Sequence, residues 1–555
     1  MPGTDGTTEG GEAAAAVSKP EATAPEGRTP ITAAGPQPLG ARAAYGLALG
    51  TGVLYYLGFP GVDLWPLSFI ALVPLLLAIR GQTPRRAAGL GWLSGFTMNM
   101  LGFSWLLDML KIFSGFPTPL CFVFMAILCA YQGGRIALCG WLYGRASAKG
   151  WAAAPIFALA FVASELVYPL LFPWYFGASV HNMPVFMQTA DLGGPYLVAL
   201  VLVAANLAIA ELLQARLDHR PIERRLVATG AAVTAIATAY GLVRMRSVGQ
   251  AMEAAPSVQV GIVQGDQPLI DRRASLLVHQ RLTADLKRQG AELVVWSEAA
   301  IPRAFPEETA NEDVRRVITR TLGVPSIVGT ILARTSQDPL DARPYRLFNT
   351  ALLADAEGKI LGRYDKQFLL AFGEYLPFGE AFPVLYKWSP NSGQFTPGTR
   401  FDALPLGEHR ISALICYEDI LPGFVNKVVR LGDPDLLVNL TNDSWFGATS
   451  EPWEHFALAK LRAVEHRRFL VRATNSGVSG IVDAVGRVVV ASPVTVPPNS
   501  PVASAPTQIA VTGRARYMRA TTGYELLGDV PFWLAAAAIF AMGFIQRPRR
   551  AARPT

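Results

Sequence analysis

Three residues of complementary chemical types stand in the second half of the chain, each directly after an apolar run. Glu298 ends "ELVVWSE", Lys366 follows "ILGRYD", and Cys416 ends "ISALIC". A carboxylate can take the proton of a thiol and later give it to a leaving group. The thiolate can attack an acyl carbon to form a thioester, and an ammonium can hold the developing oxyanion. If they meet, these residue types predict acyl transfer through a thioester.

Each residue alone also has a plainer interpretation. A cysteine beside an apolar run is usually a small, inert core residue. A glutamate at a strand end is usually solvated or caps a helix, and a lone lysine is usually surface charge. The chemistry therefore depends on a fold that gathers the strand ends, as open α/β sheets do where ligands bind at the carboxyl ends of their strands.

Short β-rich runs between residues 257 and 490 supply such strand ends. They lie at 257–265, 291–299, 325–332, 349–356, 410–418, 434–442, 469–477 and 480–490. Helical stretches, such as 272–289 and 454–467, stand between several of them. Alternating strands and helices predict a layered α/β domain. Most runs are continuously apolar, which is typical of strands covered on both faces.

The rest of the chain has the composition of a membrane protein. Hydrophobic residues make up 51% of the sequence and charged residues 16%, whereas soluble domains carry about a quarter charged residues. Apolar segments of about the 20 residues that cross a bilayer predict helices near 43–59, 64–79, 88–110, 118–143, 151–171, 194–215, 226–244 and 530–545. We therefore expect a polytopic α-helical bundle of about eight spans.

These patterns divide the chain into five parts. We predict a disordered tail, a bundle of about seven helices, an extramembrane catalytic domain, a C-terminal transmembrane helix and a basic cytoplasmic tail, at 1–40, 41–246, 247–528, 529–546 and 547–555. The first part has almost no large apolar side chains with which to form a core.

Loop charges predict the orientation of the bundle. Lys and Arg gather after the second, fourth, sixth and last predicted helices, and are sparse after the first, third and fifth. Because positive loops stay in the cytoplasm, both termini are expected there and 247–528 outside the inner membrane. Arg244 and Arg246, after the seventh helix, count mildly against this orientation. The formal net charge of +7 then needs no nucleic acid to explain it.

Other polar or reactive residues give weaker signals. Cys121, Cys129 and Cys139 lie in apolar segments without paired spacing, and the six histidines lack metal-ligand spacing, so we expect no disulfide framework, metal or cofactor. Arg135 and Glu165 fall in predicted spans. Intramembrane charges are often functional, but we favour positions near the span edges or a pair inside the bundle.

Several sequence blocks resemble a known family. The order Glu–Lys–Cys over 257–490 is similar to the nitrilase superfamily, which uses these residues on an α-β-β-α sandwich. With membrane spans on both sides, the chain resembles the apolipoprotein N-acyltransferases. The blocks that carry the resemblance are "WSEAAIP", "DKQFLLAFGEYLPFG", "ICYED", "NLTNDSWFG", "RRFLVRATNSG", "FPWYFGAS" and "TGYELLGDVPFW".

The resemblance implies roles for nine residues. The general base, the oxyanion-stabilising lysine and the nucleophile would be Glu298, Lys366 and Cys416. Supporting roles fall to Glu374, which would orient Lys366, to Glu418, which would shape the entrance or hold a loop, and to the backbone N–H of Tyr417. The side chains expected to contact the substrate are those of Trp174, Trp445 and Phe446.

The sequence departs from the family pattern at a few positions. Ser297 and Ala299 flank the base glutamate, where Pro and Thr are frequent, and Glu454 precedes His455, where a glutamine is expected. None of these differences removes a catalytic group, but each can change the pocket.

The family implies a two-step reaction. Cys416 takes an acyl chain from a membrane glycerophospholipid, and the thioester then acylates the α-amino group of the diacylglyceryl-cysteine at the N-terminus of an apolipoprotein. Lipid donor, diacylated acceptor and bilayer are the expected partners of a monomer. A membrane-tethered amidohydrolase would use the same three residues with water as acceptor, and a transporter would need two similar halves with broken spans.

Overall fold

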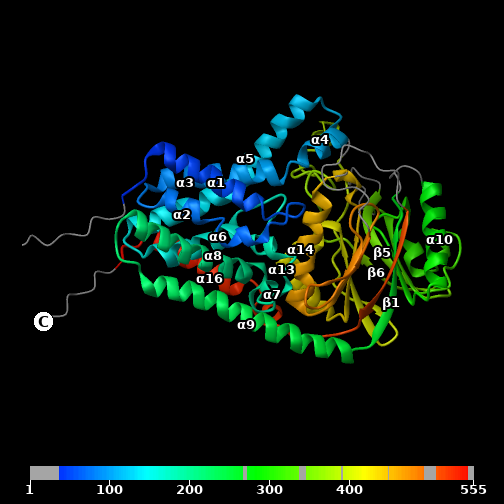
Figure 1. The fold of residues 1–555 in the computed structure, drawn as a ribbon. Helices are drawn as coiled ribbons and strands as arrows, with labels where there is room; N and C mark the ends of the chain where they lie inside the picture. The colour runs from blue at the N-terminus through cyan, green and yellow to red at the C-terminus, as the bar shows by residue number, and fades with distance from the viewer. Residues whose placement is uncertain are drawn as a thin grey trace, which may run out of the picture. The chain divides into compact units, whose positions relative to one another are not determined.

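The computed structural model describes residues 37–266, 272–336, 345–388, 392–447, 449–492 and 508–547. The predicted disordered tail and the basic C-terminal tail lie almost entirely outside these residues. The described residues from 38 onward form a helical bundle and a two-sheet sandwich (Figure 1).

Every predicted apolar segment contains a helix. The helices of the bundle are α1 (Ala41–Tyr56), α2 (Val73–Ile79), α3 (Pro84–Gly102), α4 (Leu106–Ser114), α5 (Thr118–Ala148), α6 (Ala153–Val167), α7 (Pro184–Met187), α8 (Ala190–Leu217), α9 (Arg224–Ala254) and α16 (Val530–Met542). Of the described helices, α5, α8 and α9 are long and apolar enough to cross a membrane, while α6, α16 and the run Trp65–Ile79 are shorter apolar segments.

Some boundaries differ from the predicted ones. The segment at 88–110 is broken after Gly102, and α4 begins only at Leu106. The helix expected at 151–171 ends at Val167, where Pro169 follows and disfavours helical backbone. In contrast, α9 continues past the predicted end at 244 as far as Ala254, because residues after 244 include the strong helix formers Met, Gln, Glu and Ala.

Glycines let α3 and α5 approach closely in the middle of the bundle. A Cβ added at Gly95 would lie 2.6 Å from the carbonyl oxygen of Gly133, and one at Gly91 would lie 2.3 Å from that of Ile136. Small residues at helix contacts are typical of membrane bundles, where close packing replaces hydrophobic driving force. Inside the same bundle, the buried Arg135 guanidinium lies 3.1 Å from Glu165, so these two charges of predicted spans pair.

The sandwich contains two mixed sheets. The first has the order β13-β1-β2-β4-β5-β6, with β3 beside β4, and its strands are β1 (Ser257–Gln264), β2 (Leu293–Trp296), β3 (Ile301–Pro306), β4 (Ser326–Thr335), β5 (Tyr345–Ala354), β6 (Ile360–Asp365) and β13 (Ile509–Arg516). The second has the order β12-β11-β10-β9-β8-β7, with β7 (Leu404–Leu406), β8 (His409–Ile415), β9 (Leu436–Thr441), β10 (Phe469–Thr474), β11 (Gly480–Val482) and β12 (Val488–Ala491).

Helices cover the outer faces of both sheets, as expected for an α-β-β-α sandwich. One apolar core lies between the sheets, a second packs the first sheet against α10 (Arg272–Arg288), and a third packs the second sheet against α13 (Pro422–Gly432) and α14 (Glu451–His466). Strands β3, β7 and β13 were not predicted. β13 carries arginines and pairs antiparallel with β1 across some 250 residues of sequence, which local pattern does not indicate.

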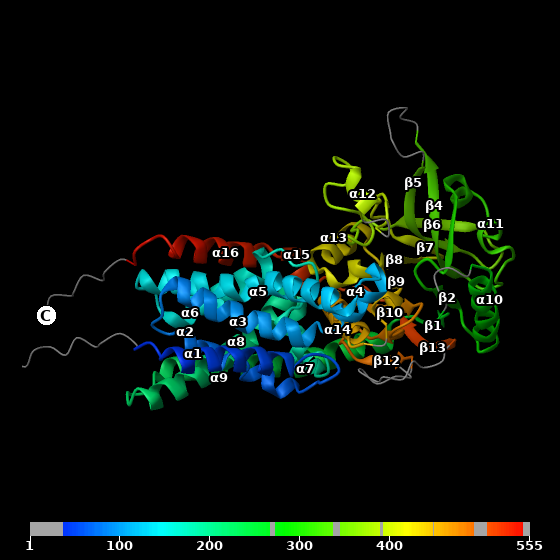
Figure 2. The ribbon, with the colours of Figure 1, turned by 90° about the horizontal axis from the view of Figure 1, so that it is seen from above.

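The layer of α13 and α14 lies between the sheets and the bundle, as Figures 1 and 2 both show. Arg467, the residue after α14, is fully buried and fastens this layer to the start of α8. Its guanidinium donates to Asp191 Oδ2 at 2.7 Å and to Gln188 Oε1 at 2.6 Å. The second sheet is thereby held at a fixed position against the bundle.

The α3–α5 contact predicts a difference between two glycines of one helix. Gly95→Leu places a side chain against the backbone of α5, whereas Gly89→Leu meets nothing within 4 Å. Overpacking costs about 1–3 kcal/mol, so Gly95→Leu should lower the midpoint of thermal unfolding in detergent and Gly89→Leu should not. Equal midpoints for the two variants would contradict the close packing.

Candidate active site

Cys416 stands at the turn where β8 ends and a short 3-10 helix (Cys416–Ile420) begins. Its backbone has φ of +52°, a left-handed conformation that is uncommon for residues other than glycine and is often found at functional sites. The side-chain amide of Asn439, on the neighbouring parallel strand β9, donates to the Cys416 carbonyl oxygen at 3.2 Å. The turn is therefore supported from the next strand.

The first sheet brings a buried ammonium and two carboxylates to this thiol. Lys366, 1% exposed, follows β6, and its Nζ lies 2.8 Å from Glu374 Oε2 and 3.5 Å from Glu298 Oε1. The Asn349 amide on β5 donates to Glu298 at 2.7 Å and to Glu374 at 3.3 Å. The Glu298 carboxylate is also close enough to the Cys416 thiol to raise the pKa of that thiol. Residues separated by more than a hundred positions thus meet at one point.

The electrostatics keep the proton on sulfur in the resting site. Burial and the Glu298 carboxylate raise the pKa of the Cys416 thiol well above its ordinary value, although the Lys366 ammonium opposes them. Burial also raises the pKa of Glu298, against the effect of Lys366. Burial would lower the pKa of Lys366, but Glu374 and Glu298 outweigh it and raise that pKa. The lysine remains charged, and Glu298 is suited to accept the thiol proton.

Glu418 is fully buried and connects the loop after Lys366 to the strand before Cys416. Its Oε1 accepts from the backbone N–H groups of Gln367 (2.7 Å) and Phe368 (3.0 Å). Its Oε2 accepts from the Ile415 N–H (2.7 Å) and the Tyr364 hydroxyl (2.9 Å). Of the two roles suggested for Glu418, these contacts are those of a residue that holds a loop.

A second buried charge network supports the turn, and the sequence reasoning missed it. Arg472 on β10 donates to Asp419 (2.7 Å) and Asp443 (3.1 Å), and His455 lies 2.9 Å and 3.2 Å from the same two carboxylates. These carboxylates help to raise the pKa of His455 to about 10, against burial and Arg472, so its ring is cationic. Arg472 itself could have indicated the network, because it is a charged residue in the apolar run "FLVRAT" and a buried charge requires partners of opposite charge.

Three residues near this network have the types and spacing of metal ligands. Ligand atoms of Asp443, Glu451 and His455 lie within 4.8 Å of one another. The positive charges of Arg472 and protonated His455 already balance the two aspartates, and both ring nitrogens of His455 contact carboxylates. The arrangement therefore fits a protein ion network better than a metal centre.

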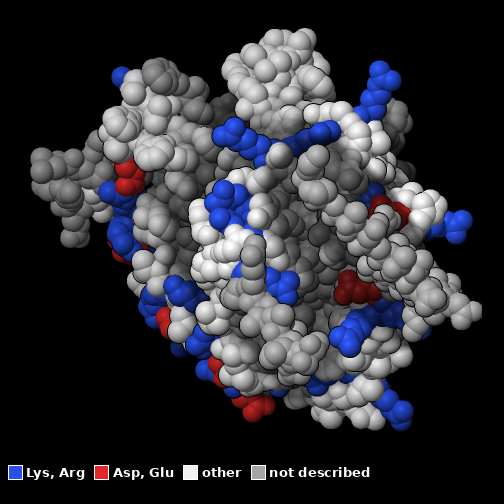
Figure 3. Space-filling view, turned by 90° about the vertical axis from the view of Figure 1, so that its left-hand side faces the viewer, with Lys and Arg blue, Asp and Glu red and all other residues white. Residues whose placement is uncertain are grey.

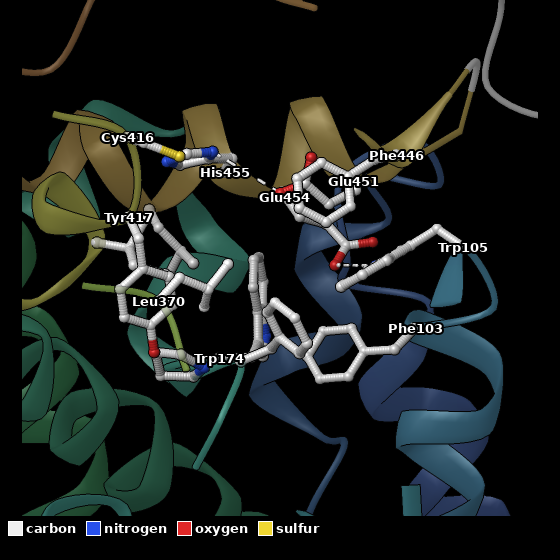
Figure 4. Close-up of a pocket in the computed structure, with 14 residues that line it drawn as sticks. Phe103, Trp105, Trp174, Leu370, Cys416, Tyr417, Phe446, Glu451, Glu454 and His455 are labelled. Atoms are coloured by element: carbon white, nitrogen blue, oxygen red, sulfur yellow. Dashed lines mark hydrogen bonds and ion pairs between the residues drawn. The ribbon is translucent and has the colours of Figure 1, made fainter. Parts of the chain in front are cut away.

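Cys416 opens onto a pocket with mainly apolar and aromatic walls between the sandwich and the bundle (Figure 4). Trp174 packs against Phe59 in a tilted arrangement with ring centroids 4.3 Å apart, and its indole N–H has no hydrogen-bond partner among the described residues. Phe446 contacts Trp105 at 5.2 Å between centroids. The hydroxyl of Tyr417 donates to the Leu171 carbonyl at 2.7 Å, across the two parts.

The structure therefore brings together eight of the nine predicted site residues. Their chemical roles remain predictions. The ninth, Trp445, has a side chain outside the described residues.

Two family models match the chain in succession. That of the apolipoprotein N-acyltransferase N-terminal domain matches residues 51–208, and that of carbon-nitrogen hydrolases matches residues 259–514. The first covers most of the bundle and the second most of the sandwich.

Curated relatives match nearly the whole chain. The apolipoprotein N-acyltransferase of Geobacter metallireducens is 29% identical over 515 residues, covering 90% of this chain and 95% of that protein. That of Methylococcus capsulatus is 30% identical over 526 residues, covering 91% and 96%. That of Rhizobium meliloti is 30% identical over 485 residues, covering 79% and 86%.

The contacts of Glu418 predict a loss of stability on removal of its charge. In Glu418→Gln the amide NH₂ faces donors that now lack an acceptor, and each such buried group costs about 1–3 kcal/mol. The midpoint of thermal unfolding should fall clearly. Glu408→Gln, at a side chain that is 88% exposed just before β8, is the matched control, and equal midpoints for the two variants would argue against the clamp.

The raised pKa of Cys416 predicts the pH dependence of its alkylation. Iodoacetamide reacts with thiolate, and the thiolate fraction of a thiol with a raised pKa keeps growing as the pH rises. The labelling rate at Cys416, followed on its peptide by mass spectrometry, should increase throughout pH 7 to 9. A plateau reached below pH 7 would show a thiolate already present in the resting site.

Proposed function

The chain belongs to the apolipoprotein N-acyltransferase family, and from this we propose how its own residues carry out the acyl transfer. The enzyme moves an acyl chain from a membrane glycerophospholipid, through a cysteine thioester, to the α-amino group of an apolipoprotein's N-terminal diacylglyceryl-cysteine. The observation that carries the assignment of residues is the Lys366–Glu298 ion pair beside Cys416, which lines a pocket between the sandwich and the bundle.

In the first step Glu298 takes the proton of Cys416 and the sulfur attacks the ester carbonyl carbon of the phospholipid. The oxyanion is held by the Lys366 ammonium and by the backbone N–H of Tyr417. When this intermediate collapses, the carbon–oxygen bond of the ester breaks. Glu298 gives its proton to the departing oxygen, so a lysophospholipid leaves and the acyl chain remains on sulfur.

In the second step the neutral α-amine of the acceptor attacks the thioester carbon. The same oxyanion donors act again, and the carbon–sulfur bond breaks. Glu298 accepts a proton from the nitrogen and returns it to the Cys416 sulfur. The products are an amide and the free thiol, which restores the resting enzyme.

The bundle supplies what a soluble sandwich lacks, because donor and acceptor are both anchored in lipid. Aromatic and aliphatic side chains of the bundle form one wall of the pocket, among them Phe103, Trp105, Phe172 and Trp174. Such a wall can hold an acyl chain beside Cys416 and keep water from the thioester. We assign Trp174, Trp445 and Phe446 to substrate contact.

We place the enzyme in the inner membrane of a bacterium, with about eight spans and the sandwich on the periplasmic side. Figure 3 views the bundle from the end opposite the sandwich, where many Lys and Arg side chains gather. The basic residues in the loops and helix ends of this side include Arg80, Arg85, Arg86, Arg145, Lys149, Arg216, Arg220, Arg224, Arg225 and Arg547. The preference of positive loops for the cytoplasm supports this orientation.

Product analysis with phospholipid and a diacylated lipopeptide tests the proposal. We expect triacylated peptide and lysophospholipid in equal amounts, and a loss of at least about 10³-fold in Cys416→Ala, because nucleophile and base act as a unit. Cys129→Ala, a buried bundle cysteine, should keep activity. Free fatty acid without triacylated peptide would instead support the amidohydrolase alternative, and full activity of Cys416→Ala would contradict the mechanism.

A further inference from the structure

Two buried carboxyl groups line the active-site pocket without a part in the mechanism above. Glu451 and Glu454 stand on the first turn of α14 and are 7% and 4% exposed. Figure 4 shows them beside His455, between Cys416 and the ring of Trp105. They therefore face the space in which a substrate group must approach the thioester.

Apart from Glu418, whose four donors are uncharged, the other acidic groups around Cys416 have cations of the chain close to them. Lys366 is ion-paired with Glu298 and Glu374. Arg472 and His455 are each ion-paired with both Asp419 and Asp443. These groups form two compact sets in which opposite charges are in contact.

Within the described ranges, Glu454 has no such partner, and Glu451 only shares His455 with the two aspartates. Glu451 Oε1 lies 3.7 Å from His455 Nδ1, which is closer to Asp443, and its Oε2 has no hydrogen-bond partner among the described residues. Glu454 accepts from the Ser450 hydroxyl at 2.9 Å and the Trp105 indole at 3.2 Å. In the part of the chain that the structure describes, no Lys, Arg or His is ion-paired with Glu454.

These carboxyl groups hold their protons while the pocket is empty. Burial raises the pKa of Glu454 to about 8. Burial and the Asp443 carboxylate raise the pKa of Glu451 well above its ordinary value. A buried acceptor without a donor is costly. A cationic donor that enters here meets the unpartnered Oε2 of Glu451 and the carboxyl group of Glu454, whose only donors among the described residues are uncharged.

We propose that Glu451 and Glu454 bind the primary ammonium group of a lipid-linked substrate beside Cys416. This inference rests on the proposed function. An ammonium offers three N–H donors to the carboxylate oxygens, and the faces of Trp105 and Phe446 in the same pocket favour a cation. Two substrates can supply the group: the α-amino group of the acceptor and the headgroup of an ethanolamine phospholipid.

The proton balance of the second step is consistent with this role. An α-amine, with a pKa near 8, enters largely as ammonium and must lose two protons to become an amide nitrogen. One passes through Glu298 to the Cys416 sulfur. The Glu451–Glu454 pair gives a proton to water when the ammonium binds, and the second proton of the ammonium then reprotonates the pair, so one proton is released for each amide formed.

The test separates the two half-reactions in Glu451→Gln, Glu454→Gln and the double variant. Lysophospholipid release without acceptor measures thioester formation, from either phosphatidylethanolamine or phosphatidylglycerol. Triacylated peptide formation measures transfer. Gln keeps the shape of Glu, and Glu465→Gln is the control, since Glu465 is buried on the same helix but paired with Arg462 (2.6 Å) and absent from the pocket.

If the acceptor's α-ammonium is bound, the double variant raises the KM for lipopeptide about tenfold or more and leaves thioester formation unchanged with both lipids. If the ethanolamine headgroup is bound, thioester formation slows with phosphatidylethanolamine but not with phosphatidylglycerol. The control should leave the ratio of the half-reactions unchanged. Unchanged rates, or equal losses in both half-reactions with both lipids, overturn the inference, whereas a wild-type enzyme that makes no triacylated peptide overturns the proposed function itself.

Discussion

A single buried ammonium, that of Lys366, determines how the catalytic end of the molecule is built. A charge with 1% exposure is tolerated only beside compensating charge, and Glu374 and Glu298 supply it at 2.8 and 3.5 Å. The same contacts fix the base and the ammonium relative to one another before any substrate arrives. Catalytic groups held in this way need little reorganisation during reaction.

The need to hold this ammonium also explains the surrounding architecture. Lys366 follows β6 of the first sheet and Cys416 follows β8 of the second. The two sheets must therefore be held at a fixed position relative to each other. Glu418 does this directly, because it binds the backbone on both sides. On the outer side, Arg467 ties α14 to the bundle through Asp191. The pocket is therefore bounded by the catalytic sandwich and by helices of the bundle.

The sequence predicted the parts of the site that follow from local pattern. Glu298, Lys366 and Cys416 stood out because reactive types followed apolar runs, and the family resemblance supplied the reason to group them. The positions of most strands were predicted from the apolar runs, and the α-β-β-α layering from the family resemblance. Most bundle helices were also placed, because long apolar segments are the strongest local signal available.

What the sequence did not predict depends on long-range contacts. The pairing of β13 with β1 joins segments far apart in the chain, and the break after Gly102 lies in an apolar stretch that reads as continuous helix. The network of Arg472, Asp419 and His455 could be suspected from a charge in a strand, but its partners could not be chosen without coordinates. The carboxyl oxygen of Glu451 that lacks a hydrogen-bond partner among the described residues is likewise recognised only when the packing around it is known.

The central claim is that Cys416 carries the acyl chain. Mass spectrometry of the enzyme after incubation with phospholipid, in the absence of acceptor, tests it most directly. We expect one acyl group on the Cys416 peptide, removable by hydroxylamine, none on Cys121, Cys129 or Cys139, and its disappearance when lipopeptide is added. Lysophospholipid release with no adduct at Cys416, or an acyl group on another residue that passes to the lipopeptide, would contradict it.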